Sequence, residues 1–258
     1  MFFFVISGYL ISTIIFSSLR QSSFSFTEFY ARRITRIFPA LLVVLLASFI
    51  LGWHVLLADE FKQLGKQIAG GAGFVSNFIL WRESGYFDNA AETKPLLHLW
   101  SLGIEEQFYF AWPLLLWTAF KFRFNLITVA IGIASISFLL NVLNVVKDPV
   151  ATFYSPQTRF WELMVGALLS QLAPAWQNWV LSIRNERRRE VLINCPSIAG
   201  STLILLGFFV IQASSLFPGW WALLPTLGAA LIVMSNTASW FNRVALSHPF
   251  LVWFGLAL

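Results

Sequence analysis

The stretch LLHLWSLGIEEQFYFAWPLLLW, residues 96–117, has the length and apolar character of a membrane-spanning helix, yet it contains His98, Glu105 and Glu106. On insertion scales a charged side chain at the centre of a bilayer costs ~2.5–3.5 kcal/mol, so these carboxylates need protein or water around them. Ionisable residues inside a membrane segment are therefore candidates for function. A purely structural alternative is that the acids only reach the lipid headgroups or pair with an arginine such as Arg159.

The whole sequence has the composition of a membrane protein. Of its residues 58% are hydrophobic and only 11% are charged, far from the balance of a soluble domain. One span needs ~20 mostly apolar residues, so the sequence predicts an all-α fold, a polytopic integral membrane helix bundle of about seven to eight transmembrane segments with the first and last incomplete. The clear spans are 38–58, 124–146, 198–216 and 220–235. The less regular ones are 1–19, 96–117, 154–176 and 246–258.

The orientation of the bundle follows from its basic residues, because short loops rich in Lys and Arg stay cytoplasmic. These residues collect in four places, namely 20–36, 121–123, 184–189 and Arg243. All four fall on one side of the membrane if every candidate segment crosses once. We therefore predict that Arg36, Arg123 and Arg188 are cytoplasmic. Glu83 and Asp88 are predicted to be external.

Residues 59–95 form the predicted extracytoplasmic loop, whose first part, 61–80, is not counted as a span. That part contains two lysines and a glycine-rich break, as expected of an interfacial or re-entrant helical piece. A loop of this length is usually functional or disordered. Its aromatic residues Trp81, Tyr86 and Phe87 favour an ordered cap on the membrane face, and a floppy connection is the alternative.

Several classes of site and partner are excluded by the composition. Cys195 is the only cysteine, which rules out an intramolecular disulfide and a cysteine-based metal site. The three histidines are far apart in the sequence, so we expect no metal. The net charge of +5 is accounted for by the cytoplasmic segments, so we expect no nucleic-acid partner. Residues 1–258 are predicted to form a single transmembrane domain with no soluble domain.

The helix at 96–117 has a polar stripe. With 3.6 residues per turn, Ser101, Glu105 and Tyr109 fall on one face, and His98 lies one turn before them on the same face. Glu106 points about 100° away, so the two acids need different partners. We take Glu105 and Glu106 as candidate catalytic residues. His98 is a third candidate, although an interfacial position alone would explain it.

Five stretches, in this order, resemble successive signatures of the acyltransferase-3 family, the membrane O-acyltransferases of the OafA/YrhL type. They are FFFVISGYLIS (2–12), FYARRITRIFPALL (29–42), LLHLWSLGIEEQFYFAWPLL (96–115), RFWELMVGALLS (159–170) and FPGWWALLPTLGAAL (217–231). The resemblance implies transfer of an acyl group, usually acetyl, from cytoplasmic acyl-CoA to a hydroxyl of a cell-envelope polysaccharide such as LPS O-antigen or peptidoglycan. It also implies a multi-pass protein of the inner membrane that uses acyl-CoA as donor substrate and no further cofactor.

The sequence also departs from the family pattern. Family members begin with another helix, which carries a basic residue and a histidine, the usual candidate base, followed by G-x-D; here Met1 stands where that aspartate would fall. The far end stops where the family continues into SYxLYLWHWP and further spans. We therefore expect a partial domain truncated at both ends, with little or no acetyl transfer by the chain alone. The resemblance matches His98 to a separate histidine of the family, not to the base.

Acyl transfer from a thioester to an alcohol needs a base, donors for the oxyanion and a cradle for the anionic CoA. Glu105, Glu106 and His98 are the predicted catalytic residues. Arg32, Arg33 and Arg36 are predicted to bind the CoA phosphates at the membrane surface, and anchoring to anionic lipid is the alternative. Predicted contacts to sugar or thioester come from Ser7, Tyr9, Trp100, Ser101 and Tyr109. For Ser7, with its neighbour Gly8, close helix packing is an equal alternative.

Two other functions compete with the enzyme. The first is a membrane carrier or flippase for an envelope saccharide, whose buried acids would line a path for substrate or protons. It predicts inverted repeats, and none is found in the sequence. The second is an inactive fragment of the acyltransferase.

Overall fold

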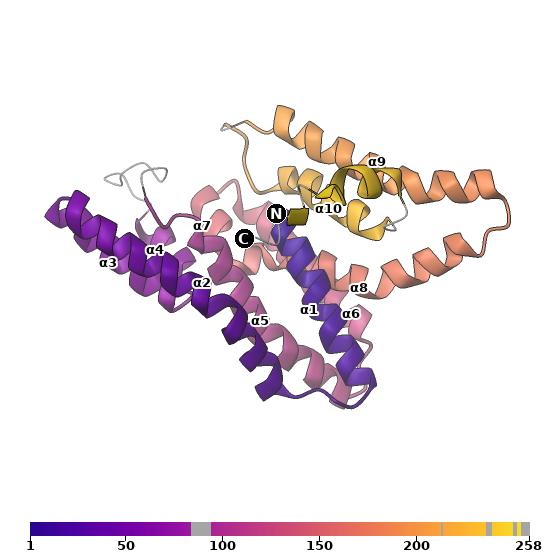
Figure 1. Cartoon of the computed structure of the whole chain (residues 1–258), viewed down its shortest axis with the longest axis horizontal. Coiled ribbons are helices and arrows are strands. Elements are labelled where there is room, and N and C mark those ends of the chain that lie inside the picture. Colours follow the sequence, from indigo (N-terminus) through magenta and orange to yellow (C-terminus); the bar gives the residue numbers. More distant parts are fainter. Residues whose placement is uncertain (84–93, 213, 236–238, 250–251, 254–258) are drawn as a thin grey trace. The chain divides into compact units, whose positions relative to one another are not determined.

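The computed structural model describes residues 1–83, 94–212, 214–235, 239–249 and 252–253. These residues fold into helices and connecting turns, and no strand occurs among them, which confirms the predicted all-α class (Figure 1). The predictions for Asp88, Tyr86 and Phe87 lie outside the described residues.

The chain divides into two compact units. Unit 1 consists of Met1–Ile14, Ile127–Ile136 and Trp161–Leu258, and unit 2 of Ile15–Leu126 and Ser137–Phe160. Helices α1 (Phe2–Arg20) and α6 (Leu126–Asn144) contribute residues to both units.

Unit 2 is built on a long helix, α2 (Phe26–Val55), which begins well before the predicted start at residue 38. Ser25 caps its N-terminus by accepting a hydrogen bond from the backbone N–H of Glu28, and the helix continues through Pro39. At 1.5 Å per residue, 30 residues span about 45 Å, more than the ~30 Å of a bilayer core. The predicted arginine cluster lies in the first third of this helix.

The rest of unit 2 packs around short helices. After α2 come α3 (Ala58–Ala72) and α4 (Ser76–Glu83), whose lengths of 15 and 8 residues are below the ~20 that a span needs. Of the predicted glycine-rich break, Gly70 and Gly71 lie inside α3, and residues 73–75 separate the two helices. Helix α5 (Leu99–Lys121) follows, and α7 (Pro149–Tyr154) and the 3₁₀ turn η2 (Pro156–Thr158) complete the unit. A core of leucines from α2, α3 and the turn before α5 joins these elements, namely Leu41, Leu45, Leu64 and Leu96.

Unit 1 contains α8 (Phe160–Leu181), α9 (Glu186–Val210), the 3₁₀ turn η3 (Trp220–Ala222), α10 (Leu223–Met234) and the π-helical turn η4 (Asn242–Leu246). Helices α1 and α8 cross in backbone contact, because a Cβ on Gly8 would overlap the carbonyl oxygen of Leu163 and a Cβ on Gly166 that of Val5. Helices α9 and α10 lie side by side in Figure 1 and meet at Gly200 and Gly228. Small residues thus allow close helix approach at both crossings.

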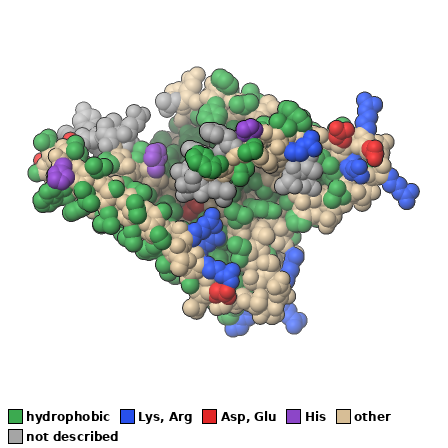
Figure 2. Space-filling view, viewed as in Figure 1, with side chains coloured by type: hydrophobic (Ala, Val, Ile, Leu, Met, Phe, Trp, Pro, Cys, Tyr) green, Lys and Arg blue, Asp and Glu red, His purple; other side chains and the backbone are tan. Residues whose placement is uncertain are grey.

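Within the described residues, four helices, α1, α2, α6 and α9, are long and apolar enough to cross a membrane. Helices α5 and α8 reach 23 and 22 residues but contain acidic side chains. Helix α10 has 12 residues, because η3 takes the first part of the predicted span 220–235. Hydrophobic side chains cover the later part of α2 (Figure 2), and exposed fractions such as 77% for Val55 and 81% for Phe209 are those of lipid-facing residues. The chain is a membrane protein.

Candidate functional site

The first third of α2 and the middle of α5 meet within unit 2. Tyr30 of α2 donates a hydrogen bond from its hydroxyl to the backbone oxygen of Phe110 on α5 at 3.1 Å. The rings of the same two residues lie 6.2 Å apart between centroids. This contact brings the arginine cluster of α2 next to the acid pair of α5.

A cleft of ≈ 380 Å³ lies at this meeting point, and we call it the acid–arginine cleft. Its lining comes from α2, from α5 and from the turn at residues 73–75. The polar lining side chains are Tyr30, Arg33, Glu106, Gln107 and Tyr109. The volume is within the range of sites that hold small molecules.

The charged groups of the cleft interact with one another. The guanidinium carbon of Arg33 lies 4.9 Å from the centre of the Tyr109 ring, a cation–π distance. Glu106 interacts electrostatically with Arg33, and its Oε1 is buried and accepts no hydrogen bond among the described residues. Glu105 accepts a hydrogen bond from the Tyr109 hydroxyl at 3.0 Å. The two acids therefore have different main contacts, as their angular separation on the helix predicts.

The third wall of the cleft is the turn between α3 and α4, and two amides fix it. Gln107 Nε2 donates to the backbone oxygen of Phe74 at 2.9 Å and to Asn77 Oδ1 at 3.0 Å. Asn77, which is fully buried, donates from Nδ2 to the backbone oxygen of Tyr154 at 3.1 Å. A Cβ on Gly103 would stand 3.1 Å from both Asn77 Oδ1 and the Phe74 oxygen, so glycine lets α5 approach this turn closely. The sequence analysis did not single out Asn77 or Gln107.

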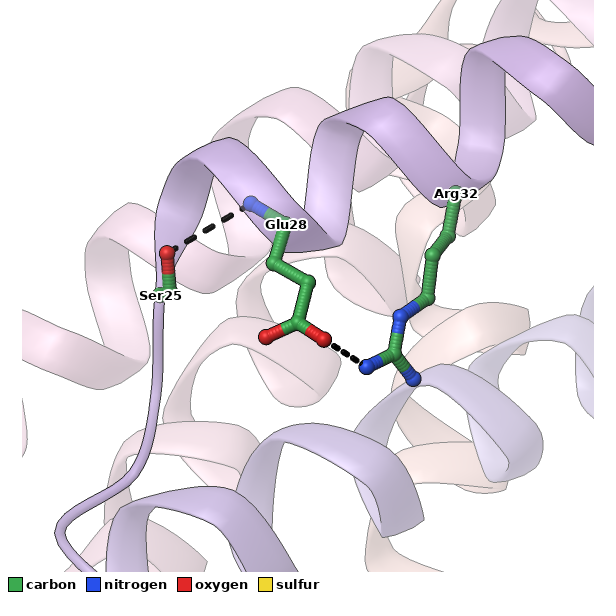
Figure 3. A network of polar contacts seen from close by, with 3 residues as sticks. All are labelled: Ser25, Glu28 and Arg32. Atoms are coloured by element: carbon green, nitrogen blue, oxygen red, sulfur yellow. Dashed lines mark hydrogen bonds and ion pairs between the residues drawn. The ribbon is translucent and has the colours of Figure 1, made fainter.

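The three predicted CoA-binding arginines have different surroundings. Arg33 lines the cleft. Arg32 forms an ion pair with Glu28, one turn earlier on α2, and Figure 3 shows this pair beside the Ser25 cap. The two paired side chains are 72% and 59% exposed, so solvent screens the pair. Arg36 is exposed on the same helix.

The remaining predicted residues of α5 lie near its start. His98 is exposed, is the residue that precedes the helix, and does not line the cleft. The Ser101 hydroxyl donates to the backbone oxygen of His98 at 3.2 Å. Trp100 packs on Phe153 with 4.6 Å between ring centroids, and the guanidinium carbon of Arg159 lies 5.4 Å from the centre of the Trp100 ring. Trp100 thus belongs to an aromatic cluster around the buried Arg159.

Ser7 and Tyr9 belong to unit 1. Both lie on α1, on either side of Gly8, where α1 crosses α8. Tyr9 packs against a buried cluster that includes Val5 and Leu169. Tyr9 therefore takes part in helix packing in unit 1.

Comparison with known proteins gives a family match over nearly the whole chain. The model of the acyltransferase domain called acyltransferase-3 matches residues 1–256. A Haemophilus influenzae protein of uncharacterized function is 36% identical over 246 residues, which cover 91% of this chain and 97% of that protein. The Listeria monocytogenes peptidoglycan O-acetyltransferase OatA is 30% identical over 263 residues, which cover 98% of this chain and 42% of OatA. The chain thus spans less than half of the length of OatA, and no solved structure matches it.

Proposed function

The chain belongs to the acyltransferase-3 family, and on this basis we propose that it forms the membrane part of an O-acyltransferase of the inner membrane. The donor is acyl-CoA, with acetyl as the favoured group, and the acceptor is a hydroxyl of an envelope polysaccharide. Peptidoglycan is the favoured acceptor, because it is named for the Listeria relative, and LPS O-antigen is the second. The observation that carries the proposal is the acid–arginine cleft, where a carboxylate, a guanidinium and a phenol share one small space.

Each of these groups has a role in acyl transfer. The acceptor hydroxyl oxygen forms a bond to the thioester carbon, the carbon–sulfur bond breaks, and the hydroxyl proton passes to Glu106 and from there to the departing CoA sulfur. Arg33 stabilises the oxyanion that forms on the carbonyl oxygen. Glu105 holds the Tyr109 hydroxyl at the edge of the reacting groups.

The exposed arginines of α2 have a separate role in this proposal. Arg36 remains the candidate for the CoA phosphates, since a guanidinium keeps its charge and donates paired hydrogen bonds. Arg32 is the weaker candidate because its guanidinium already forms an ion pair with Glu28. His98 has no role in the proposed reaction, because it does not line the cleft.

Donor binding separates the acyltransferase from a saccharide carrier. The purified chain in lipid nanodiscs is titrated with radiolabelled acetyl-CoA, and unlabelled CoA serves as competitor. We expect saturable binding that CoA displaces. Absence of saturable acetyl-CoA binding would refute the proposal and favour a carrier or an inactive fragment.

The identity of the acceptor polysaccharide is tested by measuring ester-linked acetate in the cell envelope. Acetate released by mild alkali from peptidoglycan and from LPS is compared between wild-type cells, a gene deletion and a strain with Glu106→Gln at the native locus. We expect one polysaccharide to lose acetate equally in the deletion and in the variant, because a general base contributes ~10²–10⁴ in rate. Unchanged acetate in both polysaccharides would contradict the proposed reaction.

A further inference from the structure

Unit 1 contains a second polar cleft, unrelated to the residues of the proposed reaction. It has a volume of ≈ 370 Å³ and lies between the first turns of α9 and the segment that leads into η4. Its polar lining residues are Glu186, Arg189, Glu190, Asn194, Trp240 and Arg243. Two guanidinium groups and two carboxylates thus face one space, and their charges balance.

The two sides of this cleft are fixed to each other. The backbone N–H of Trp240 donates to Asn194 Oδ1 at 2.7 Å. The side-chain amide of Asn242 donates to the Ser235 hydroxyl at 2.9 Å and so anchors η4 to the end of α10. Close packing of α9 on α10 at Gly200 and Gly228 holds both elements along their length.

The charged groups of the cleft are only loosely paired with one another. Arg189 Nη2 and Glu186 Oε1 form an ion pair at 3.8 Å, too long for a hydrogen bond, and the Glu186 side chain is 89% exposed. The side chain of Arg189 is 39% exposed, and Trp240 is 58% exposed beside it. A tryptophan next to arginines at the end of an apolar helix is typical of the membrane–water interface. Figure 2 shows charged side chains gathered where α8 leads into α9.

An apolar groove continues from the cleft along α9. It has a volume of ≈ 460 Å³ and shares Glu190 and Asn194 with the cleft. Its other lining residues are Val191, Cys195, Ile198 and Ala199, the last of them about two and a half turns beyond Glu190. The groove therefore leads from the charged end of α9 into its apolar, membrane-spanning part. The charged cleft matches the headgroup of a phospholipid, and the apolar groove that continues from it matches one acyl chain.

We propose that the cleft and the groove together bind a phospholipid with a zwitterionic headgroup, namely phosphatidylethanolamine. The phosphate oxygens accept hydrogen bonds from Arg189 and Arg243, and the ammonium donates to Glu186 and Glu190. One acyl chain lies in the groove beside Ile198. Anionic phosphatidylglycerol would leave the two carboxylates opposed to its charge, and the methylated ammonium of phosphatidylcholine has no N–H to donate.

Lipid retention by the full chain tests this site. The purified chain in detergent micelles is mixed with equal amounts of phosphatidylethanolamine, phosphatidylglycerol and phosphatidylcholine with identical acyl chains, and bound lipid is counted by native mass spectrometry. We expect preferential retention of phosphatidylethanolamine. The double variant Arg189→Gln/Arg243→Gln should weaken this retention about ten- to thirty-fold, from the loss of two basic groups near the membrane surface. The matched control is Arg184→Gln/Arg187→Gln, which removes the same charge outside the cleft.

The acidic residues give a second readout that does not depend on loss of binding. The double variant Glu186→Gln/Glu190→Gln leaves two unbalanced guanidinium groups, so its preference should move from phosphatidylethanolamine to phosphatidylglycerol. Equal retention of all three lipids by the wild type would overturn the proposal. An equal loss of retention in the control variant would also overturn the proposal, since the lipid would then respond to the surface charge in general and not to the residues of the cleft. Displacement of the lipid by acetyl-CoA would assign the cleft to the acyl donor instead.

Discussion

Replacing Asn77 by alanine is expected to loosen the wall of the acid–arginine cleft without removing any group that reacts. Asn77 is fully buried, accepts from Gln107 at 3.0 Å and donates to the Tyr154 oxygen at 3.1 Å. The variant removes both hydrogen bonds. Gln107 keeps its second bond, to the Phe74 oxygen at 2.9 Å, so the turn is weakened but not released.

The size of the effect follows from these contacts. A buried polar group that loses its partner costs ~1–3 kcal/mol, and here two groups each lose one partner. Because Gln107 keeps one acceptor, we expect a loss of ~2–4 kcal/mol in the free energy of unfolding. For a chain of this size ~1 kcal/mol corresponds to ~2–4 °C in Tm, so Tm should fall by roughly 5–15 °C.

Thermal unfolding in detergent, followed by tryptophan fluorescence, measures the change in Tm, and acetyl-CoA titration measures the state of the cleft. Asn178→Ala is the matched control, because Asn178 is exposed on α8 and such a change stays within ~0.5 kcal/mol. A Tm for Asn77→Ala within 2 °C of the wild type would refute the reasoning about the buried amides. A lowered Tm with unchanged acetyl-CoA affinity would show that the cleft does not depend on this wall.

Three further predictions follow from the same contacts. Arg36→Lys should weaken acetyl-CoA binding about tenfold while Arg32→Lys changes it little, since Arg36 is the candidate for the CoA phosphates and Arg32 already pairs with Glu28; equal effects in the titration would contradict this. Gly166→Ala should lower stability by ~1–3 kcal/mol, whereas Gly132→Ala, with open space around it, should raise it by up to ~1 kcal/mol; a Tm measurement giving the same sign for both would contradict this. A single cysteine at Arg123 should react only with reagent that enters the cytoplasm, and labelling from outside would reverse the topology.

The sequence predicted the class of fold but placed helix starts too late where the first turns are polar. The apolar run that defines a span begins at residue 38, but α2 begins at Phe26. Its first turns are stabilised by the Ser25 cap and by the pair of Glu28 with Arg32, and neither contributes to hydropathy. The same reason applies to α9, whose start at Glu186 follows a capping asparagine and precedes the predicted span. A hydropathy pattern marks the part of a helix in lipid, whereas capping and ion pairs decide where the helix begins.

The spacing of the arginines identified a cluster but not its member in the cleft. Arg32, Arg33 and Arg36 were all predicted to bind the CoA phosphates, with Arg32 and Arg36 on one face of a helix and Arg33 beside it. The structure instead turns Arg33 toward Glu106, because Tyr30 bonds to Phe110 and so decides which side of α2 meets α5. That choice depends on a contact between residues 80 positions apart in sequence. Periodicity within one helix carries no information about such a contact.

Asn77 and Gln107 were missed for a related reason. Gln107 directly follows the two acids and Asn77 stands in a short segment, and no repeat marks either of them. Their role exists only through hydrogen bonds to each other and to the Phe74 and Tyr154 oxygens. Two amides that bond to each other, to the turn between α3 and α4 and to the end of α7 can be recognised only once those elements are placed. Little or no acetyl transfer by the chain alone stays a prediction; robust turnover by the purified chain would contradict it and would point to His98 or a glutamate as the base.

The separate contacts of Glu105 and Glu106 explain how an otherwise apolar helix accommodates two adjacent carboxylates. Glu105 is one turn from Tyr109 and is held within its own helix, at 3.0 Å. Glu106, about 100° around the axis, reaches the side of α5 that meets α2 and there interacts with Arg33. Because Arg33 also lies over the Tyr109 ring, the guanidinium joins both acids into one charged group at the cleft. The two adjacent positions therefore make separate contacts: Glu105 bonds to a phenol of its own helix, and Glu106 faces the partner helix.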